Sequence, residues 1–214
     1  MEFGVWRVQE MKHILFVCTG NTCRSPMAEA LLKKKDPNIE VRSAGIFAHN
    51  GSPASQGTVE ALKGQGVELN HRSQPVTKEL LQWADIVLTM TKQHKQNLIL
   101  EFPKFEEIIF TLKEYVLEGH EGDWERLKQV YSTLEDKKTV FLQKNKHKYD
   151  NNTELEKALW SHLKEEIELI KEIESTLPNI DVSDPFGGSL DTYERTLSEI
   201  EKHIELLVKK LDNE

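Results

Sequence analysis

The sequence predicts an α/β protein built on a four-stranded, parallel, doubly wound sheet, with a helical hairpin inserted into the chain. Three observations lead to this fold class. Short runs rich in branched apolar residues alternate with helical stretches through the first half of the chain. Right-handed crossovers place such strands in one parallel sheet with helices on both faces. A charged segment of helical periodicity then separates this half from a final amphipathic stretch.

Four runs have the length and composition of strands that are buried on both faces. They are residues 13–17 (HILFV), 40–44 (EVRSA), 85–90 (DIVLTM) and 108–112 (IIFTL). Helical stretches, punctuated by turn sequences such as DPN and HNGSP, lie near residues 25–35, 54–65, 77–83 and 92–101. The order βαβαβαβ predicts an active site at the carboxyl ends of the strands, and Cys18 stands at such an end.

The segment from residue 118 to 178 is charged and holds two runs of apolar residues spaced by threes and fours. Between the runs, YDNNTELE contains two asparagines that suit a turn, and Thr153 with Glu156 fits a capping box. We therefore predict an antiparallel helical hairpin with arms of roughly 25 residues, each about 37 Å long. Its narrow apolar seam suits either a solvated spacer or an element that binds a protein partner or self-associates.

The final amphipathic stretch, residues 191–212, is expected to pack back on the sheet. The predicted organisation is therefore a discontinuous domain of residues 11–117 and 179–214, interrupted by the hairpin at 118–178. Residues 1–10 form an N-terminal extension.

Composition limits the function classes. A chain of 214 residues with 38% hydrophobic residues can bury one core plus an appendage. A net charge of -8 argues against nucleic-acid or anionic-membrane partners. No apolar run approaches the roughly 18 residues of a membrane span, and no export signal is evident, so we expect a cytoplasmic protein. Two cysteines, Cys18 and Cys23, are too few for a disulfide scaffold and favour reduced thiols with a chemical role.

The segment CTGNTCRS, residues 18–25, carries the most specific chemistry. The chain leaves a strand at Cys18, turns through small residues and enters a helix at about Arg24. Backbone N–H groups and the positive helix end then converge in front of Cys18 and favour its thiolate. A guanidinium six residues later can hold two oxygens of a phosphoryl group bidentately. The C-x5-R spacing therefore predicts nucleophilic attack on phosphorus.

The segment DVSDPFGGS, residues 181–189, supplies a candidate general acid. Thiolate attack expels a leaving group that must be protonated, and the same carboxyl can later act as a base toward water. Asp184 is the candidate because Pro185 restrains the backbone of the residue before it. Asp181 lacks that restraint and is the weaker competitor.

Four motifs stand out in the sequence: VCTGNTCRSPMAEA at 17–30, RSAG at 42–45, TMTKQHK at 89–95 and DPFGG at 184–188. Together they resemble the low-molecular-weight protein tyrosine phosphatase family, and in detail its bacterial protein-arginine phosphatases. The resemblance covers about residues 11–120 and 180–212. It implies a flavodoxin-like sheet, a phosphocysteine intermediate on Cys18 and proton transfer by Asp184, with no metal or other cofactor. It also implies phosphate binding by Thr19, Gly20, Asn21, Thr22, Cys23 and Arg24.

The resemblance further implies a hydrogen-bond network that fixes the phosphate loop and runs from Asn21 through Ser25 and Ser43 to His71. An asparagine tolerates the left-handed backbone that such a loop needs, which is an independent reason for Asn21. A reactive thiol beside a second one also predicts that Cys23 is the redox partner of Cys18, through a reversible disulfide.

Two departures from the tyrosine-specific pattern favour another substrate. The tyrosine phosphatases resemble one another in having a bulky aliphatic residue in the phosphate loop, and Thr22 stands at that position here. They also have two aromatic residues after the Asp-Pro pair, whereas here Phe186 is followed by Gly187. A planar, cationic phosphoguanidinium can stack on Phe186, hydrogen-bond near Thr22 and pair with Asp184. We therefore expect hydrolysis of N-phosphoarginine in protein substrates.

Other functions compete with this interpretation. A protein tyrosine phosphatase of the same family would use the same loop. An arsenate reductase of this fold needs resolving cysteines on a later segment, and none follows Cys23. A zinc site on Cys18 and Cys23 finds no further ligands at a recognised spacing. An interaction module acting through the hairpin remains open, although the presence of Cys18, Arg24 and Asp184 favours catalysis.

Overall fold

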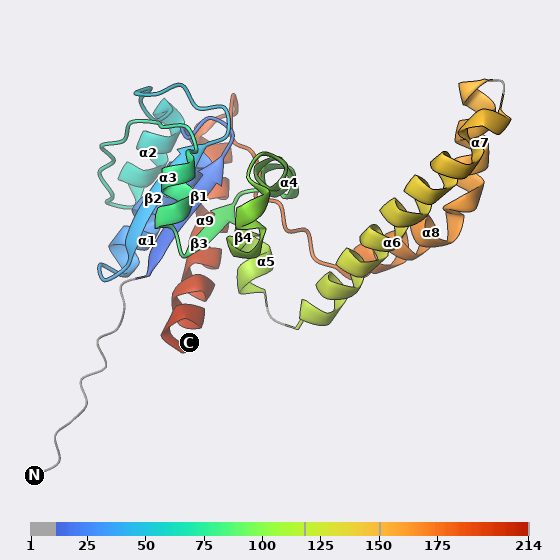
Figure 1. Cartoon of the computed structure of the whole chain (residues 1–214). Coiled ribbons are helices and arrows are strands. Elements are labelled where there is room, and N and C mark those ends of the chain that lie inside the picture. The colour runs from blue at the N-terminus through green and yellow to red at the C-terminus, as the bar shows by residue number, and fades with distance from the viewer. Residues whose placement is uncertain (1–11, 118, 150, 214) are drawn as a thin grey trace, which may run out of the picture. The chain divides into compact units, whose positions relative to one another are not determined.

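The computed structural model describes residues 12–117, 119–149 and 151–213 (Figure 1). The chain divides into two compact units, Met1–Leu117 with Ile180–Glu214, and Glu118–Asn179. The expected N-terminal extension at residues 1–10 lies outside the described residues. No helix in the described ranges is long and apolar enough to cross a membrane.

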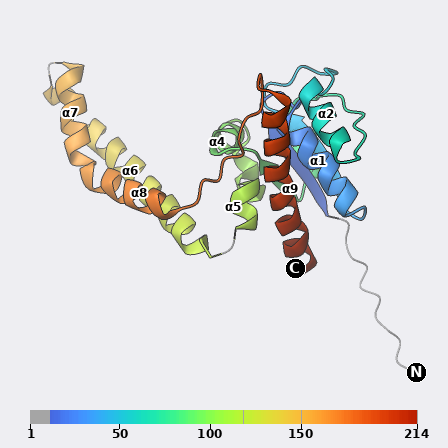
Figure 2. The same cartoon turned by 180° about the vertical axis from the view of Figure 1, so that it is seen from behind.

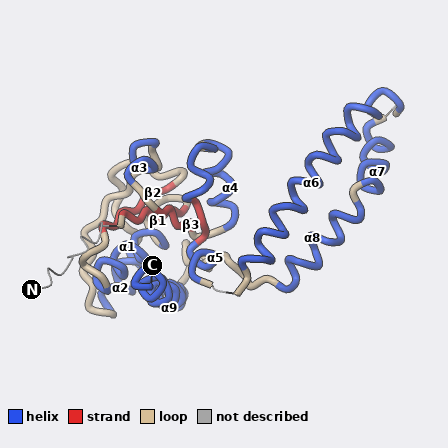
Figure 3. Tube along the Cα trace, turned by 60° about the horizontal axis from the view of Figure 1, so that its bottom comes forward, coloured by secondary structure: helices blue, strands red, loops and turns tan. Residues whose placement is uncertain are grey.

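The first unit is built on a parallel sheet of four strands in the order β2-β1-β3-β4. The strands are β1 (His13–Cys18), β2 (Glu40–Gly45), β3 (Ile86–Thr89) and β4 (Ile109–Thr111). Figure 3 shows β2, β1 and β3 side by side. The chain runs outward from β1 to β2 and then returns past β1 to β3, so the strand order reverses beside the end of β1. Such a reversal is where open α/β sheets place their ligands, and Cys18 ends β1 there.

Helices cover both faces of this sheet, which confirms the predicted fold class. They are α1 (Arg24–Lys35), α2 (Gln56–Gly64), α3 (Lys78–Trp83), α4 (Lys92–Glu101), α5 (Leu112–Val116) and α9 (Leu190–Asn213), with a 3-10 turn, η1 (Pro103–Ile108). Figure 2 shows α1, α2 and α9 on the side of the sheet that faces the viewer.

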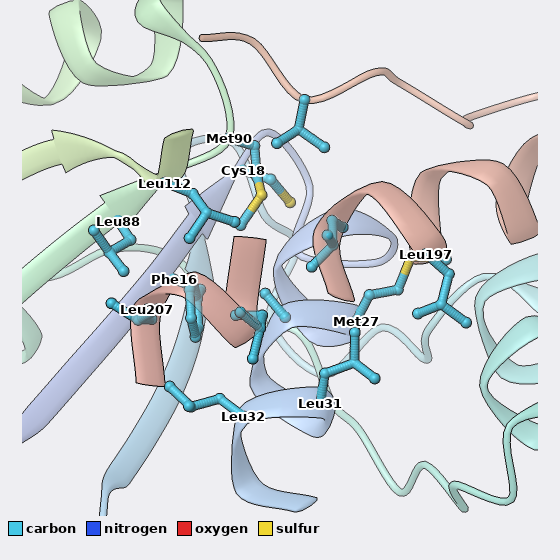
Figure 4. Close-up of a cluster of buried hydrophobic side chains, with 14 of the residues drawn as sticks. Phe16, Cys18, Met27, Leu31, Leu32, Leu88, Met90, Leu112, Leu197 and Leu207 are labelled. Carbon is cyan, nitrogen blue, oxygen red and sulfur yellow. The ribbon is translucent and has the colours of Figure 1, made fainter. Parts of the chain in front are cut away.

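Alternating side chains of β1 enter two separate cores. Phe16 packs with Met27 of α1 and Leu197 of α9 in one cluster of buried residues (Figure 4). Val17 packs with Leu98 and its neighbours on the other face. Every residue of β1 from Ile14 to Cys18 is buried, as expected for a central parallel strand. The prediction that the final amphipathic stretch packs back on the sheet is also confirmed.

The second unit is an antiparallel pair of helical arms. The first arm is α6 (Glu121–Asn145), and a 3-10 turn, η2 (Lys146–Lys148), follows it. The second arm comprises α7 (Asn152–His162) and α8 (Lys164–Thr176). Leu127, Ile170 and Ile173 form its small core. Contacts between the arms show that they are antiparallel, because residues later in the first arm contact residues earlier in the second. The pairs are Tyr131 with Glu174, Lys137 with Glu166 and Phe141 with His162.

Two details of the predicted hairpin were wrong. The second arm is not one helix of about 25 residues, because Leu163 leaves the helical conformation between α7 and α8 with φ -98° and ψ 4°. The arm also begins earlier than the proposed Thr153 capping box. Asn151 is the N-cap, and its side chain accepts a hydrogen bond from the Glu154 N–H at 2.8 Å. Asparagine is as good an N-cap as serine or threonine, so the more N-terminal residue takes this position.

Candidate active site

The loop after β1 joins the end of the strand to the start of α1. Cys18 is 3% exposed, and α1 begins at Arg24. The N-cap of α1 is Cys23, whose side chain makes no capping hydrogen bond within the described structure. The first N–H groups of this helix therefore have no capping side chain, which leaves them for an anion in front of Cys18.

Asn21 holds the loop in its turned conformation. It has φ 54°, the one positive φ of a non-glycine residue in the part of the chain that the structure describes. Its Nδ2 donates to Ser25 Oγ at 3.0 Å and to Ser43 Oγ at 2.8 Å, and its Oδ1 accepts from the Gln74 N–H at 3.0 Å. His71 Nε2 lies 2.7 Å from the main-chain oxygen of Asn21. The structure thus brings together the four network residues expected from sequence, with His71 reaching Asn21 directly, and adds Gln74.

Ser25 connects this network to the candidate nucleophile. Its Oγ lies 3.0 Å from Cys18 Sγ. Because Asn21 Nδ2 already donates to that oxygen, the single hydroxyl hydrogen of Ser25 has two acceptors within reach, the Cys18 sulfur and, at the longer distance of 3.4 Å, the Ala44 carbonyl. A donor aimed at the sulfur stabilises a thiolate.

Arg24 and Asp184 form an ion pair at the other side of the loop. Arg24 Nη2 lies 2.8 Å from Asp184 Oδ2, with the arginine side chain 6% exposed and the aspartate 54% exposed. Nη1 donates to the Val182 carbonyl at 3.3 Å. The Phe186 N–H donates to Asp184 Oδ1 at 3.2 Å and orients the carboxylate. Arg24 Nε is buried and has no hydrogen-bond partner among the described residues, so an acceptor is missing at this donor.

The weaker candidate, Asp181, has a different place. Its Oδ1 accepts a hydrogen bond from the Lys92 N–H, at the start of α4, at 2.7 Å. Its main-chain oxygen accepts from Lys113 Nζ at 2.7 Å. Asp181 therefore joins the segment to α4 and α5, whereas Asp184 is the carboxylate that contacts Arg24.

Residue His94, which the sequence motifs contained but did not single out, supports the loop from α4. It is 7% exposed, and its Nε2 lies 2.8 Å from Thr19 Oγ1. Its Nδ1 lies 2.9 Å from the hydroxyl of Thr91, the N-cap of α4. Burial lowers the pKa of His94 to about 4, aided by the positive charge of Arg24 and opposed by Asp184 and Asp181. The ring is neutral at pH 7, so one nitrogen donates and the other accepts.

Gly45, the last residue of RSAG, lies against the same loop. A Cβ atom at this position would lie 2.6 Å from the Thr19 oxygen and 2.8 Å from the Asn21 nitrogen, closer than real contacts allow. Only glycine lets β2 approach the loop backbone this closely. Just beyond it, the Phe47 N–H donates to the Thr19 carbonyl at 2.9 Å, and the Phe47 side chain is 70% exposed. The sequence analysis did not identify Phe47 as a site residue, and its aromatic side chain was the only feature of the sequence that could have done so.

Thr22 and Cys23 face the N-terminal end of α2. The Thr22 carbonyl accepts from the Ser55 N–H at 2.9 Å, and its own hydroxyl lies 3.6 Å from Cys23 Sγ. Cys23 Sγ donates to Ser55 Oγ at 3.3 Å and lies 3.8 Å from the Tyr193 hydroxyl. Both cysteines are buried and free, and Phe186 is 76% exposed on the Asp184 loop.

Comparison with known proteins identifies the family. The family model described as low molecular weight phosphotyrosine protein phosphatase matches residues 13–151. The chain belongs to this family. The resemblance drawn from the sequence motifs is thereby confirmed, and the loop described above is the C-x5-R loop of a low-molecular-weight phosphatase.

Two curated relatives in this phosphatase family are protein-arginine-phosphatases. One, from Bacillus subtilis (strain 168), is 37% identical over 202 residues, which cover 92% of this chain and 95% of the relative. The other, from Geobacillus stearothermophilus, is 52% identical over 111 residues, which cover 51% of this chain and 74% of the relative. A low-molecular-weight protein-tyrosine-phosphatase, PtpB of Staphylococcus aureus, is 43% identical over 108 residues, which cover 50% of this chain and 76% of that protein.

Solved structures of the phosphatase family share the fold. The YwlE arginine phosphatase from Geobacillus stearothermophilus aligns with a TM-score of 0.65 at 34% identity and covers 94% of each chain. A YwlE mutant with a phosphorylated active-site serine aligns with a TM-score of 0.63 at 35% identity, covering 94% of this chain and 95% of that one.

Proposed function

We propose that this phosphatase hydrolyses N-phosphoarginine in proteins through a phosphocysteine intermediate on Cys18. The observation that carries the chemistry is the buried Arg24 guanidinium, whose Nε has no hydrogen-bond partner among the described residues and whose Nη2 is held by Asp184. A phosphoryl group in front of Cys18 would accept from Nε and Nη2 together, in the bidentate geometry that arginine offers to phosphate. Its entry releases the Asp184 carboxyl from Arg24.

The proposed reaction has two steps. In the first, the Cys18 thiolate attacks phosphorus, the P–N bond breaks, and Asp184 transfers its proton to the departing guanidine nitrogen. In the second, the Asp184 carboxylate takes a proton from water, whose oxygen attacks phosphorus and releases phosphate with the thiolate. The amides of residues 19–24, the N-terminus of α1 and Arg24 stabilise the charge on the equatorial oxygens. Ser25 stabilises the thiolate before attack and after release.

Selectivity for arginine is proposed to rest on Thr22 and Phe186, with Phe47 as a second exposed aromatic residue beside the loop. Phe47 is attached to the phosphate loop through its backbone, and Phe186 to Asp184 through its own N–H. A guanidinium plane can stack on such rings. One curated relative and one solved structure that each match more than 90% of the chain are named arginine phosphatases, which supports the same substrate, while two solved structures that match 93% and 94% of it are named tyrosine phosphatases.

The test of this selectivity is the substitution Thr22→Ile, which adds bulk and removes a hydroxyl. We expect the ratio of kcat/KM for phosphoarginine over phosphotyrosine to fall roughly tenfold to 200-fold, or about 1–3 kcal/mol in relative transition-state binding. Thr22→Val is the matched control, because it removes the hydroxyl while nearly keeping the volume. An unchanged ratio in both variants would leave only a phosphatase of this family, with tyrosine phosphatase activity as the alternative.

Two further parts of the proposal concern the surroundings of the enzyme. We propose that it acts in the cytoplasm on phosphorylated proteins and uses no metal. We also propose that the hairpin binds a protein partner or a second copy of the chain and takes no part in the chemistry. In support, its buried core is small, while Tyr131 and Trp160 expose 44% and 64% of their surface.

A further inference from the structure

The segment that carries Asp184 contains no helix or strand from Ile180 to Ser189. Its position therefore depends on individual contacts with the surrounding elements. One of these contacts is the hydrogen bond, 2.8 Å long, from the Val182 N–H to the carbonyl of Met90, the residue that follows β3. The contacts on either side of Val182 involve one ion pair, between the buried Lys113 of α5 and the partly buried Glu199 of α9.

Lys113 holds the N-terminal part of this segment. Its side chain is 9% exposed, and its Nζ lies 2.6 Å from Glu199 Oε1. The same ammonium donates to the main-chain oxygen of Asp181 at 2.7 Å. A buried ammonium needs its charge compensated and its donors paired; Glu199 compensates the charge, and Glu199 and the Asp181 carbonyl each accept one N–H.

Glu199 holds the residue just before Asp184. Its Oε2 accepts from the Ser183 N–H at 3.2 Å and from the Ser183 hydroxyl at 2.5 Å. Burial alone would raise the pKa of Glu199, but the hydrogen bonds from Lys113 and Ser183 lower it below its ordinary value. The carboxylate is therefore ionised at neutral pH and joins Lys113 to Ser183.

The place of the hairpin in the chain gives a second reason why the Lys113–Glu199 ion pair matters for the position of Asp184. Lys113 lies shortly before the hairpin unit in the sequence and Asp181 shortly after it, because that unit comprises Glu118–Asn179. Because the hairpin unit is long, the covalent chain through it restrains only weakly the distance between the residue before it and the residue after it. The contact of Lys113 with Asp181 ties them directly, and α5 also packs against α9.

We propose that Lys113 and Glu199 are positioning residues that hold the 181–183 backbone so that Asp184 reaches the leaving group, an inference that rests on the function proposed above. Neither side chain touches the reacting atoms. They act through Asp181 and Ser183, on the two sides of the Val182 carbonyl that accepts from Arg24. The pair thus sets the distance between the acid and the phosphate loop.

The experiment measures kcat/KM for a series of aryl phosphates whose phenol leaving groups differ in pKa. This parameter reports phosphoryl transfer to Cys18, the step in which Asp184 protonates the leaving group. A functioning acid makes the rates nearly independent of leaving-group pKa. We expect Lys113→Met and Glu199→Gln to lose roughly 10- to 100-fold on the poorest leaving groups and less than about threefold on the best.

Two controls sharpen the result. Lys35→Met removes another lysine that pairs with α9, through Glu205 at 2.9 Å and Glu201 at 3.4 Å, but does not contact the acid-bearing segment. It should keep the parent profile. Asp184→Asn defines the profile of a lost acid, and adding Lys113→Met to it should not steepen the dependence further, because both changes act through one group.

The positioning role would be overturned if a variant with parent-like circular dichroism lost kcat/KM equally on every leaving group, or did not lose it at all. If Lys113→Met does not fold, Glu199→Gln decides, since it keeps the side-chain volume while removing the charge and one of the two acceptor oxygens. A parent chain that hydrolyses neither phosphoarginine nor any aryl phosphate would instead overturn the proposed function, and this inference with it.

Discussion

Arg24 and Asp184, 160 residues apart in the sequence, meet with 2.8 Å between Nη2 and Oδ2. The contact compensates a guanidinium whose side chain is 6% exposed, and uncompensated burial of such a charge is costly. It also keeps the candidate acid beside the place where phosphate would bind. One ion pair therefore links the phosphate loop to the segment that begins after the hairpin.

The first prediction concerns Arg24→Lys. A lysine keeps the charge but loses the fork of Nε and Nη2, so we expect kcat on a small aryl phosphate to fall roughly 100- to 1000-fold. Arg72→Lys is the control, because Arg72 donates to the Gly51 carbonyl in a solvent-exposed contact. Steady-state kinetics at saturating substrate measures both. A kcat within about twofold of the parent would contradict bidentate phosphate binding by Arg24.

Oxidation provides the second prediction. Mild peroxide should inactivate the enzyme reversibly, because a sulfenic acid on Cys18 can be captured by Cys23 as a disulfide. In Cys23→Ala we expect the same treatment to cause a loss that dithiothreitol does not reverse. Mass spectrometry of the parent tests the linkage, and an overoxidised Cys18 without a cross-link to Cys23 would reject the protective role.

The third prediction follows from the pKa of His94, which burial lowers to about 4 in the folded protein from an ordinary value of 6.5. Between these values the unfolded chain binds the proton first, so stability falls as the pH is lowered. The contribution is complete above about pH 6.5 and is lost toward pH 4, with an upper bound of roughly 3 kcal/mol.

His94→Gln should therefore flatten the dependence of the unfolding free energy on pH in this range. Urea unfolding at several values between pH 5 and pH 7 measures it. The pKa of His203 is also lowered, chiefly by burial, but it contributes to parent and variant alike. Parallel pH profiles for the two proteins would show that His94 does not titrate as its surroundings require.

The hairpin provides the fourth prediction. Replacing residues 120–177 by a short Gly/Ser linker should leave a folded phosphatase unit, because the apolar core of the hairpin is separate from both cores on the sheet. Cleavage of a small phosphorylated compound should persist, while activity on phosphorylated proteins or self-association in sedimentation should decrease. Equal loss on small and large substrates would show that the hairpin supports the fold or the Asp184 segment.

The elements that sequence predicted well are those whose signals are local. The run of apolar residues in β1 and the small residues after it identify a strand and a loop without any distant partner. Cys18 and Arg24 are likewise separated by only six positions within a single loop, so their spacing can be read directly from the sequence. The proline after Asp184 marked a restrained carboxylate, and the structure places that carboxylate, and not Asp181, against Arg24.

The tertiary structure decided which distant groups complete the site. Gln74 bonds to Asn21, His94 to Thr19 and Glu199 to Ser183, and in none of these pairs does the sequence around one residue specify the other. The break of the second hairpin arm at Leu163 also escaped the periodicity, which continues through it. Periodicity and motif spacing report interactions between near neighbours in the chain, so the sequence by itself determined the strands, the reactive loop and the helices other than α5 and the divided second arm. Contacts between distant segments arise only when those elements pack, and packing alone brought these partners to the loop.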